Sequence, residues 1–177
     1  MKLKLLLLLT PMCFFAQERV TTSSGKTVLL NSNYTWKYED QKDSGLKPEY
    51  FKATSNSITA GLLDKIKIPV KNGEDQDVNV EFSFNSKTEE FNTISIEKIQ
   101  RMIDYSRDFT MLRLKNKYSF IPRKVSIYYS NDRGGWAVIW DYTAKNSYGG
   151  EAQGSNVVMF DNEANKAYDV LEFPKKK

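Results

Sequence analysis

The sequence of 177 residues contains no histidine and a single cysteine, Cys13. Serine–histidine and cysteine–histidine catalysis and ordinary zinc sites each need one of these side chains. The groups that remain for an enzyme are carboxylates, lysines and tyrosines, and the acids here fall mainly in predicted turns and on a helix face. We therefore expect no enzyme, no catalytic or metal-ligating residue and no cofactor.

Long hydrophobic runs are also absent, except at the N-terminus. Lys2 and Lys4 precede an apolar stretch over residues 5–15, and Ala16 follows as a small residue. This order of a basic, an apolar and a small-residue region is typical of a secretory signal peptide. The stretch contains Pro11 and is shorter than the roughly 20 residues of a membrane-spanning helix.

Cleavage after Ala16 is the interpretation we adopt for residues 1–16, which makes the protein periplasmic or extracellular. The alternative is a lipoprotein anchored through an acylated Cys13, with Met12 where a smaller residue is usual. Cleavage removes Lys2 and Lys4, so the formal net charge falls from +4 to +2. Such a balanced charge argues against a nucleic-acid partner, and no later segment is apolar for long enough to cross a membrane. The sequence gives no indication of oligomeric state.

Residues 17–38 predict a small β-meander of three short strands, over residues 19–22, 26–30 and 34–38, with Ser, Asn and Gly in the turns. Its pattern Gly-Lys-x-Val-x-Leu-Asn, followed by Thr-Trp-x-Tyr, resembles a hairpin that begins many secreted bacterial proteins of unknown function. That resemblance implies export and no activity. The residues that match the hairpin pattern are Gly25, Lys26, Val28, Leu30, Asn31, Thr35, Trp36 and Tyr38.

Residues 39–48 are rich in charge, with Gly45 and Pro48, and predict a linker.

Residues 49–177 predict one α+β domain, an antiparallel β-sheet with one main α-helix packed on it. Alternating apolar residues predict a hairpin of strands over residues 66–70 and 78–84. The acidic turn over residues 72–77 lacks the ligand spacing of a calcium loop, so we interpret it as solvated. Residues 53–65 are left unassigned.

The helix is expected to begin after Ser95, a good N-cap, and to end at about residue 108 or 110. Three or four strands should follow, over residues 124–130, 136–145, 156–160 and 166–173, with Gly, Asn and Asp in the turns. Asp104 and Asp108 lie one helical turn apart, which could indicate acid–base catalysis, but Arg107 beside them favours a solvated helix face. The apolar stripe of the helix comprises Ile96, Ile99, Met102, Ile103 and Phe109.

Residues 109–150 carry a second resemblance. A Leu-Lys-Asn-x-x-Ser-Phe-like segment, a strand and the turn Asn146-Ser147-Tyr148-Gly149-Gly150 occur in this order. They resemble small exported bacterial domains, often lipoproteins, which implies architecture and export but no assigned chemistry.

The turn has two interpretations. The structural one is that Asn146 and the glycines supply left-handed backbone positions, while Tyr148 packs over the turn. The functional one is that Asn146, Ser147 and Tyr148 form a polar lip, with Trp136, Trp140 or Tyr142 as the floor of a binding site. The structural interpretation requires both tryptophans to be buried, and the functional one requires one of them to be exposed.

A basic stretch provides one more candidate. It resembles a patch for an anionic polymer, although alternation of Leu112 and Leu114 with basic residues favours a segment with one buried and one solvated side. Its members are Arg113, Lys115, Lys117, Arg123 and Lys124, with Tyr118 and Phe120 between them.

These features favour an exported, non-enzymatic interaction module that binds an envelope protein or a cell-wall polymer. The alternatives are a carboxylate-dependent glycan hydrolase and a structural envelope component. Two facing carboxylates in a deep cleft would favour the hydrolase.

Overall fold

The computed structural model describes residues 18–21, 27–30, 36–38 and 45–174, and divides into two units, Met1–Asp43 and Ser44–Lys177. The predicted signal peptide, Cys13 and the turns of the meander lie outside the described residues. In the first unit, strands β1 (Glu18–Thr21), β2 (Thr27–Leu30) and β3 (Trp36–Tyr38) form an antiparallel sheet in the order β1-β2-β3. Its strands fall within one or two residues of the expected bounds.

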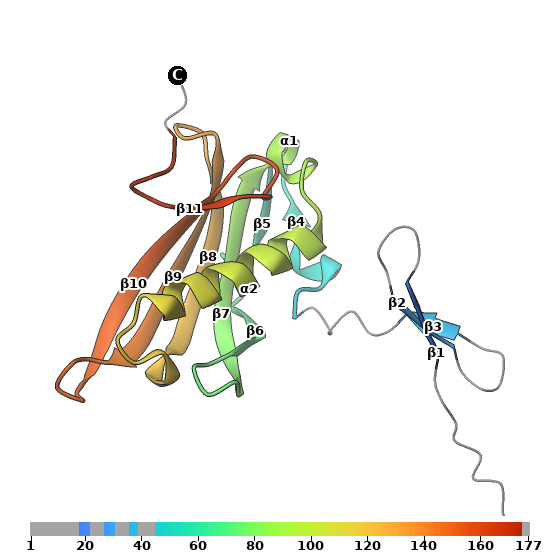
Figure 1. Cartoon of the computed structure of the whole chain (residues 1–177). Coiled ribbons are helices and arrows are strands. Elements are labelled where there is room, and N and C mark those ends of the chain that lie inside the picture. Colours follow the sequence, from blue (N-terminus) through green and yellow to red (C-terminus); the bar gives the residue numbers. More distant parts are fainter. Residues whose placement is uncertain (1–17, 22–26, 31–35, 39–44, 175–177) are drawn as a thin grey trace, which may run out of the picture. The chain divides into compact units, whose positions relative to one another are not determined.

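The second unit is an α+β domain built on an eight-stranded sheet (Figure 1). The strand order is β11-β10-β9-β8-β7-β5-β4, and β6 also pairs with β7. Short helices α1 (Thr88–Phe91), η1 (Pro48–Tyr50) and η2 (Lys117–Ser119) connect the strands, and α2 (Ile96–Leu112) is the long helix. The strands are β4 (Lys52–Ala53), β5 (Ser57–Ala60), β6 (Ile66–Lys71), β7 (Asp77–Lys87), β8 (Ile121–Ser130), β9 (Gly135–Lys145), β10 (Glu151–Phe160) and β11 (Ala167–Asp169).

The sheet is mixed, which corrects the expectation of a purely antiparallel one. Strands β7 and β8 pair in parallel, with Phe82 opposite Val125, whereas every other pairing in this sheet is antiparallel. A parallel pair needs a long crossover, and the segment containing α1 and α2 provides it. The helix therefore crosses the sheet because it joins two parallel neighbours.

The hairpin of β6 and β7 is confirmed, and the unassigned region contains β5 and the last residue of β4. Both β5 and β6 pair with the same edge of β7, β6 up to Phe82 and β5 from Phe84 onward. The chain passes between them at Gly61, which has φ +67 and where a Cβ would lie 1.8 Å from the Phe82 carbonyl oxygen. Only glycine fits such a left-handed position so close to a neighbouring strand.

Helix α2 begins where expected, because the Ser95 side chain accepts a hydrogen bond from the Lys98 backbone N–H. Its buried face differs from the expected stripe toward the C-terminal end. Ser106 and Thr110 are buried there, whereas Phe109 is half-buried and stacks on Tyr105. Successive buried positions three or four residues apart form one helical face, so the polar residues continue the stripe.

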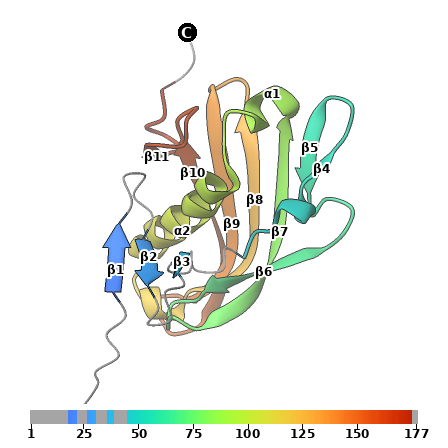
Figure 2. The ribbon, with the colours of Figure 1, turned by 90° about the vertical axis from the view of Figure 1, so that its right-hand side faces the viewer.

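The helix lies across one face of the sheet, as the two views show (Figures 1 and 2). Trp136, Val138 and Trp140 alternate along β9 and belong to the main core, as the two-residue period predicts. On the opposite face, Ala137 packs in a smaller cluster with Met159 and Phe173. The C-terminal segment thus covers part of the face that α2 leaves open.

The last residues of the predicted linker belong to the second unit. Leu46 is 2% exposed and lies in the main core. A Cβ at Gly45 would lie 2.7 Å from the Pro69 Cδ, so the chain passes close to β6 here. Residues 39–44 lie outside the described residues.

Candidate functional site

Both candidate tryptophans are core residues. Trp136 and Trp140 have no exposed surface. Their indole N–H groups donate to the Asn162 carbonyl oxygen at 3.0 Å and to Ser106 Oγ at 2.8 Å, respectively. Because buried polar groups require such partners, these contacts explain both residues structurally. Neither tryptophan can form the floor of a surface site.

Tyr142 is half-buried, and its ring packs against Phe120 with centroids 5.3 Å apart. It also lies across Gly154, its partner on β10, where a Cβ would come within 2.6 Å of the Tyr142 ring. A large ring that covers a cross-strand glycine stabilises the sheet locally. Tyr142 therefore has a clear structural role at this position.

The turn between β9 and β10 is held by the Asn146 side chain. Asn146 Oδ1 accepts hydrogen bonds from the backbone N–H groups of Tyr148 at 2.9 Å and Gly150 at 3.0 Å. Within the turn, the left-handed conformation falls on Gly149, with φ +80, and not on Asn146. Tyr148 is 96% exposed, so the expectation that it packs over the turn is wrong. Hydrogen bonds from Asn146 close the turn without help from the ring.

Beside this turn, the structure contains a pocket of about 320 Å³, which we call the end pocket. Three segments that are distant in sequence form its walls: the β6–β7 turn, the region around η2, and the β9–β10 hairpin. These segments lie at the same end of the sheet (Figure 1). The lining residues are Asn72, Glu74, Gln76, Asn116, Tyr118, Ser119, Ile121, Thr143, Ala144, Lys145 and Glu151.

The first two walls are joined at Gly73. Its backbone N–H donates to the Phe120 carbonyl oxygen at 2.8 Å. A Cβ at this position would lie 2.2 Å from the Lys117 carbonyl oxygen and 2.6 Å from that of Tyr118. The turn can approach η2 this closely only because residue 73 has no side chain.

Ser119 joins the second wall to the third. Its Oγ donates to the Asn116 carbonyl oxygen at 2.8 Å and accepts from the Lys145 backbone N–H at 2.9 Å. Lys115 Nζ also donates to Ser147 Oγ at 2.9 Å, which connects the β9–β10 turn to the segment before η2. The candidate turn residues are thus joined to the rim of the pocket, and its walls are fixed relative to one another.

Several side chains of the end pocket are free to bind a ligand. Within the described residues, Glu74, Asn116 and Glu151 make no side-chain hydrogen bond or ion pair. Tyr118 is 64% exposed, with Lys117 Nζ 5.3 Å from its ring centroid. By contrast, the Asn72 side chain is occupied, because its Oδ1 accepts from the backbone N–H groups of Glu74 and Gln76.

Sequence reasoning missed Glu74, Asn116 and Glu151 as site residues. It interpreted the β6–β7 turn as a solvated loop and Asn116 as part of a helix exit. The signal that could have pointed here is Gly73, because a glycine in a polar turn often marks close approach of another backbone. Strand order, which brings the three turns together, could not be read from that glycine.

The basic stretch runs from the C-cap of α2 through η2 into β8, so its residues do not share one element. Leu112 is the last residue of α2 and is 77% exposed, contrary to the expected alternation. Arg113 pairs with Asp169, and Arg123 donates to Thr143 Oγ1. Phe120 is fully buried, so it is a core residue and not an exposed stacking platform.

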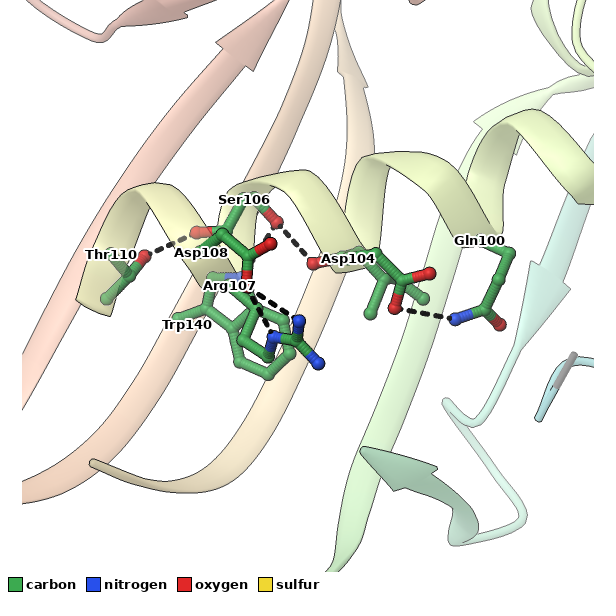
Figure 3. Close-up of polar contacts among 8 residues, drawn as sticks. Gln100, Asp104, Ser106, Arg107, Asp108, Thr110 and Trp140 are labelled. Carbon is green, nitrogen blue, oxygen red and sulfur yellow. Dashed lines mark hydrogen bonds and ion pairs between the residues drawn. The ribbon is translucent and has the colours of Figure 1, made fainter. Parts of the chain in front are cut away.

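The two helix carboxylates considered for catalysis have separate partners (Figure 3). Asp108 accepts from the Arg107 guanidinium at 2.6 Å, and Asp104 accepts from Gln100 Nε2 at 3.3 Å. Asp108 is exposed and Asp104 half-buried. These separate partners favour the interpretation of Asp104 and Asp108 as part of a solvated helix face over a catalytic pair.

Two residues with shifted pKa values, Tyr129 and Asp169, lie outside the end pocket. Burial, and secondarily the nearby Glu90 carboxylate, raises the pKa of Tyr129 above its usual value. The pKa of Asp169 is lowered, first by a hydrogen bond from the Leu171 backbone N–H and then by one from Arg113. Neither residue lines the end pocket.

Across the described ranges, no cluster of three or more acidic or cysteine side chains could hold a metal ion. No helix in this described part is long and apolar enough to cross a membrane. Comparisons with known protein families, curated proteins and solved structures find no match to this chain. The fold and pocket define an α+β domain with a polar pocket at the end of a mixed sheet.

Proposed function

We propose that this protein is an exported, non-enzymatic interaction module whose end pocket binds sugar units of a cell-wall polymer. The observation that carries the proposal is the combination of fixed walls with uncommitted amide, carboxylate and tyrosine side chains in one pocket. A volume of about 320 Å³ lies within the size range of small-molecule sites.

The chemistry of the free side chains suits a glycan. Each sugar hydroxyl both donates and accepts a hydrogen bond. Glu74 and Glu151 supply acceptors, and the Asn116 amide supplies both donors and an acceptor. The exposed Tyr118 ring offers an apolar face against which the C–H face of a sugar can pack. Tyr148 lies on the adjoining turn and extends the surface available to a longer chain.

Export is part of the proposal, with residues 1–16 as a signal peptide that is cleaved after Ala16. The chain then belongs with the small exported bacterial domains that its hairpin and Asn-Ser-Tyr-Gly-Gly segment resemble. Mass spectrometry of the N-terminus of the native protein tests this. We expect a mature chain that begins at Gln17, whereas a chain that begins at a lipid-modified Cys13 would indicate a membrane-anchored lipoprotein.

Binding is tested by co-sedimentation of the purified protein with insoluble peptidoglycan, chitin and cellulose. We expect the wild type to sediment with at least one of these polymers and the Tyr118→Ala variant to remain in the supernatant. Tyr128→Ala is the matched control, because Tyr128 is 40% exposed and lies outside the end pocket. Equal retention of the two variants, or no retention of the wild type on any polymer, would contradict the glycan proposal. Specific capture of an envelope protein instead would favour a protein partner.

A second candidate, glycan hydrolysis, is favoured by one observation: Glu74 and Glu151 line the same pocket. Glycosidases use two such carboxylates on either side of the scissile bond. Incubation of the retained polymer with wild type, Glu74→Gln and Glu151→Gln distinguishes the candidates. A binding module leaves the polymer intact, while cleavage by the wild type that both variants lose would identify a hydrolase.

A further inference from the structure

A second hollow, which we call the helix groove, lies between α2 and the turn that joins β10 to β11. Its volume is about 490 Å³, and it shares no residue with the end pocket. Two cations line it, Arg101 on α2 and Lys166 at the end of the turn. Within the described residues, neither side chain makes a hydrogen bond or ion pair.

The walls of the groove include three aromatic side chains, Tyr105, Phe160 and Tyr168. Tyr105 is 54% exposed and packs edge-on against Phe160, with ring centroids 6.1 Å apart. Tyr168 lies on β11 and also lines the groove. A hollow with apolar walls and a few converging polar groups is the usual form of a small-molecule site.

The turn that forms one wall is held in a costly conformation. Ala164 lines the groove with φ +55, a left-handed conformation that residues with a Cβ rarely adopt. Its backbone N–H donates to the Asp161 carbonyl oxygen at 2.9 Å, and its side chain packs against the main core. Strained residues of this kind persist where the surroundings determine them strongly, and they are frequent at binding sites.

The turn is also attached to the helix. Lys98 Nζ donates to the Glu163 carbonyl oxygen at 2.8 Å. The Glu163 carboxylate itself accepts from Asn165 Nδ2 at 2.9 Å, so this nearby acid already has a partner. Arg101 and Lys166 are therefore the charged side chains of the groove that have no partner among the described residues.

From this geometry we infer that the helix groove is a binding site for an aromatic carboxylate. The carboxylate lies between Arg101 and Lys166, because a guanidinium and an ammonium both form strong charge-assisted hydrogen bonds with it. The flat apolar body of the ligand packs against Tyr105, Tyr168 and Phe160. The inference does not depend on the glycan proposal, because the two sites share no residue.

The test is a titration of the purified protein with benzoate, followed by NMR. We expect saturable shifts of the amides around Arg101 and Lys166. Benzamide, a neutral analogue of the same shape, should bind about tenfold more weakly, as loss of a charge-assisted interaction implies. Arg101→Gln and Lys166→Gln should each weaken benzoate binding by a similar factor. Lys145→Gln, in the end pocket, is the matched control and should bind like the wild type.

Arg101 and Lys166 are both exposed, so their variants should fold, and an unchanged melting temperature checks this. Tyr105→Ala provides a second test, because it should weaken benzoate binding without removing a charge. Equal affinity for benzoate and benzamide would overturn the proposal. Wild-type affinity of both glutamine variants for benzoate would also overturn it. The same holds if inorganic phosphate binds as tightly as benzoate.

Discussion

Trp140 Nε1 donates a hydrogen bond to Ser106 Oγ at 2.8 Å, and neither residue has any exposed surface (Figure 3). This contact joins the centre of β9 to the middle of α2. Ser106 Oγ in turn donates to the Ile103 carbonyl oxygen at 3.1 Å. Thr110, one turn later, accepts from Asn156 on β10 at 2.9 Å. The helix is therefore positioned on the sheet by hydrogen bonds as well as by apolar packing.

Ser106→Ala should lower the free energy of unfolding by about 1–3 kcal/mol, because it leaves the buried Trp140 N–H without an acceptor. Denaturant unfolding followed by tryptophan fluorescence measures this. Ser155→Ala is the control: Ser155 is exposed on β10, makes no side-chain hydrogen bond among the described residues, and should change stability by less than about 0.5 kcal/mol. Equal stability of the two variants would contradict the role of the Trp140–Ser106 contact.

Gly73→Ala should separate the β6–β7 turn from η2. The added Cβ would meet the Lys117 and Tyr118 carbonyl oxygens within 2.6 Å. We expect a loss of about 1–3 kcal/mol of stability from this overpacking, together with weaker binding of the polymer that the wild type retains. Thermal unfolding and the co-sedimentation assay measure the two effects.

Gly150→Ala is the matched control for this substitution. Its nearest neighbour would be Asn146 Nδ2 at 3.4 Å, and its backbone is outside the left-handed region. The control should unfold at the same temperature as the wild type or at a slightly higher one, because alanine reduces the conformational entropy of the unfolded chain. If Gly73→Ala behaves in the same way, the turn does not depend on this close approach.

Arg113→Gln should raise the pKa of Asp169 toward its ordinary value of about 4, because one of the two hydrogen bonds that lower it is lost. The Leu171 backbone N–H, which contributes more, remains. A carboxylate whose pKa is depressed by folding stabilises the fold above its unfolded pKa, and this contribution disappears as the pH falls through the folded pKa. In wild type, therefore, acidification below pH 4 should loosen β11 from β10.

Carboxyl-carbon NMR of Asp169 and hydrogen exchange of the β10–β11 amides measure both effects. Asp169→Asn should remove the contribution of this residue to the pH dependence of β10–β11 hydrogen exchange. Lys115→Gln is the control, because Lys115 bonds Ser147 and not Asp169. An Asp169 pKa that is the same in wild type and Arg113→Gln would show that the Arg113 contact does not persist in solution.

Alternation and capping made much of the fold predictable. The two-residue period correctly placed Trp136, Val138 and Trp140 on one face, and Ser95 correctly marked the start of α2. Strand neighbours could not be predicted in this way, because alternation gives the face of a residue and not the strand beside it. The parallel pairing of β7 with β8 was missed for this reason.

The candidate site was predicted less well. Trp136, Trp140 and Tyr142 were predicted as site residues because they are aromatic and precede a glycine-rich turn. Large rings, however, occur in cores as readily as on surfaces. The end pocket depends on side chains such as Glu74 and Asn116, which are unremarkable in sequence and become neighbours only through strand order. The predicted lip residues Asn146, Ser147 and Tyr148 are the part of the expected site that the structure leaves exposed.

The most direct test of the glycan proposal is isothermal titration of the protein with a soluble oligosaccharide from the polymer that it retains. Asn116→Ala should weaken binding about tenfold, since it removes the proposed hydrogen bonds to the sugar and breaks no side-chain hydrogen bond among the described residues. Asn85→Ala, exposed on β7 and outside the end pocket, should bind like the wild type. Equal affinity of Asn116→Ala and wild type would contradict the assignment of the end pocket as the glycan site.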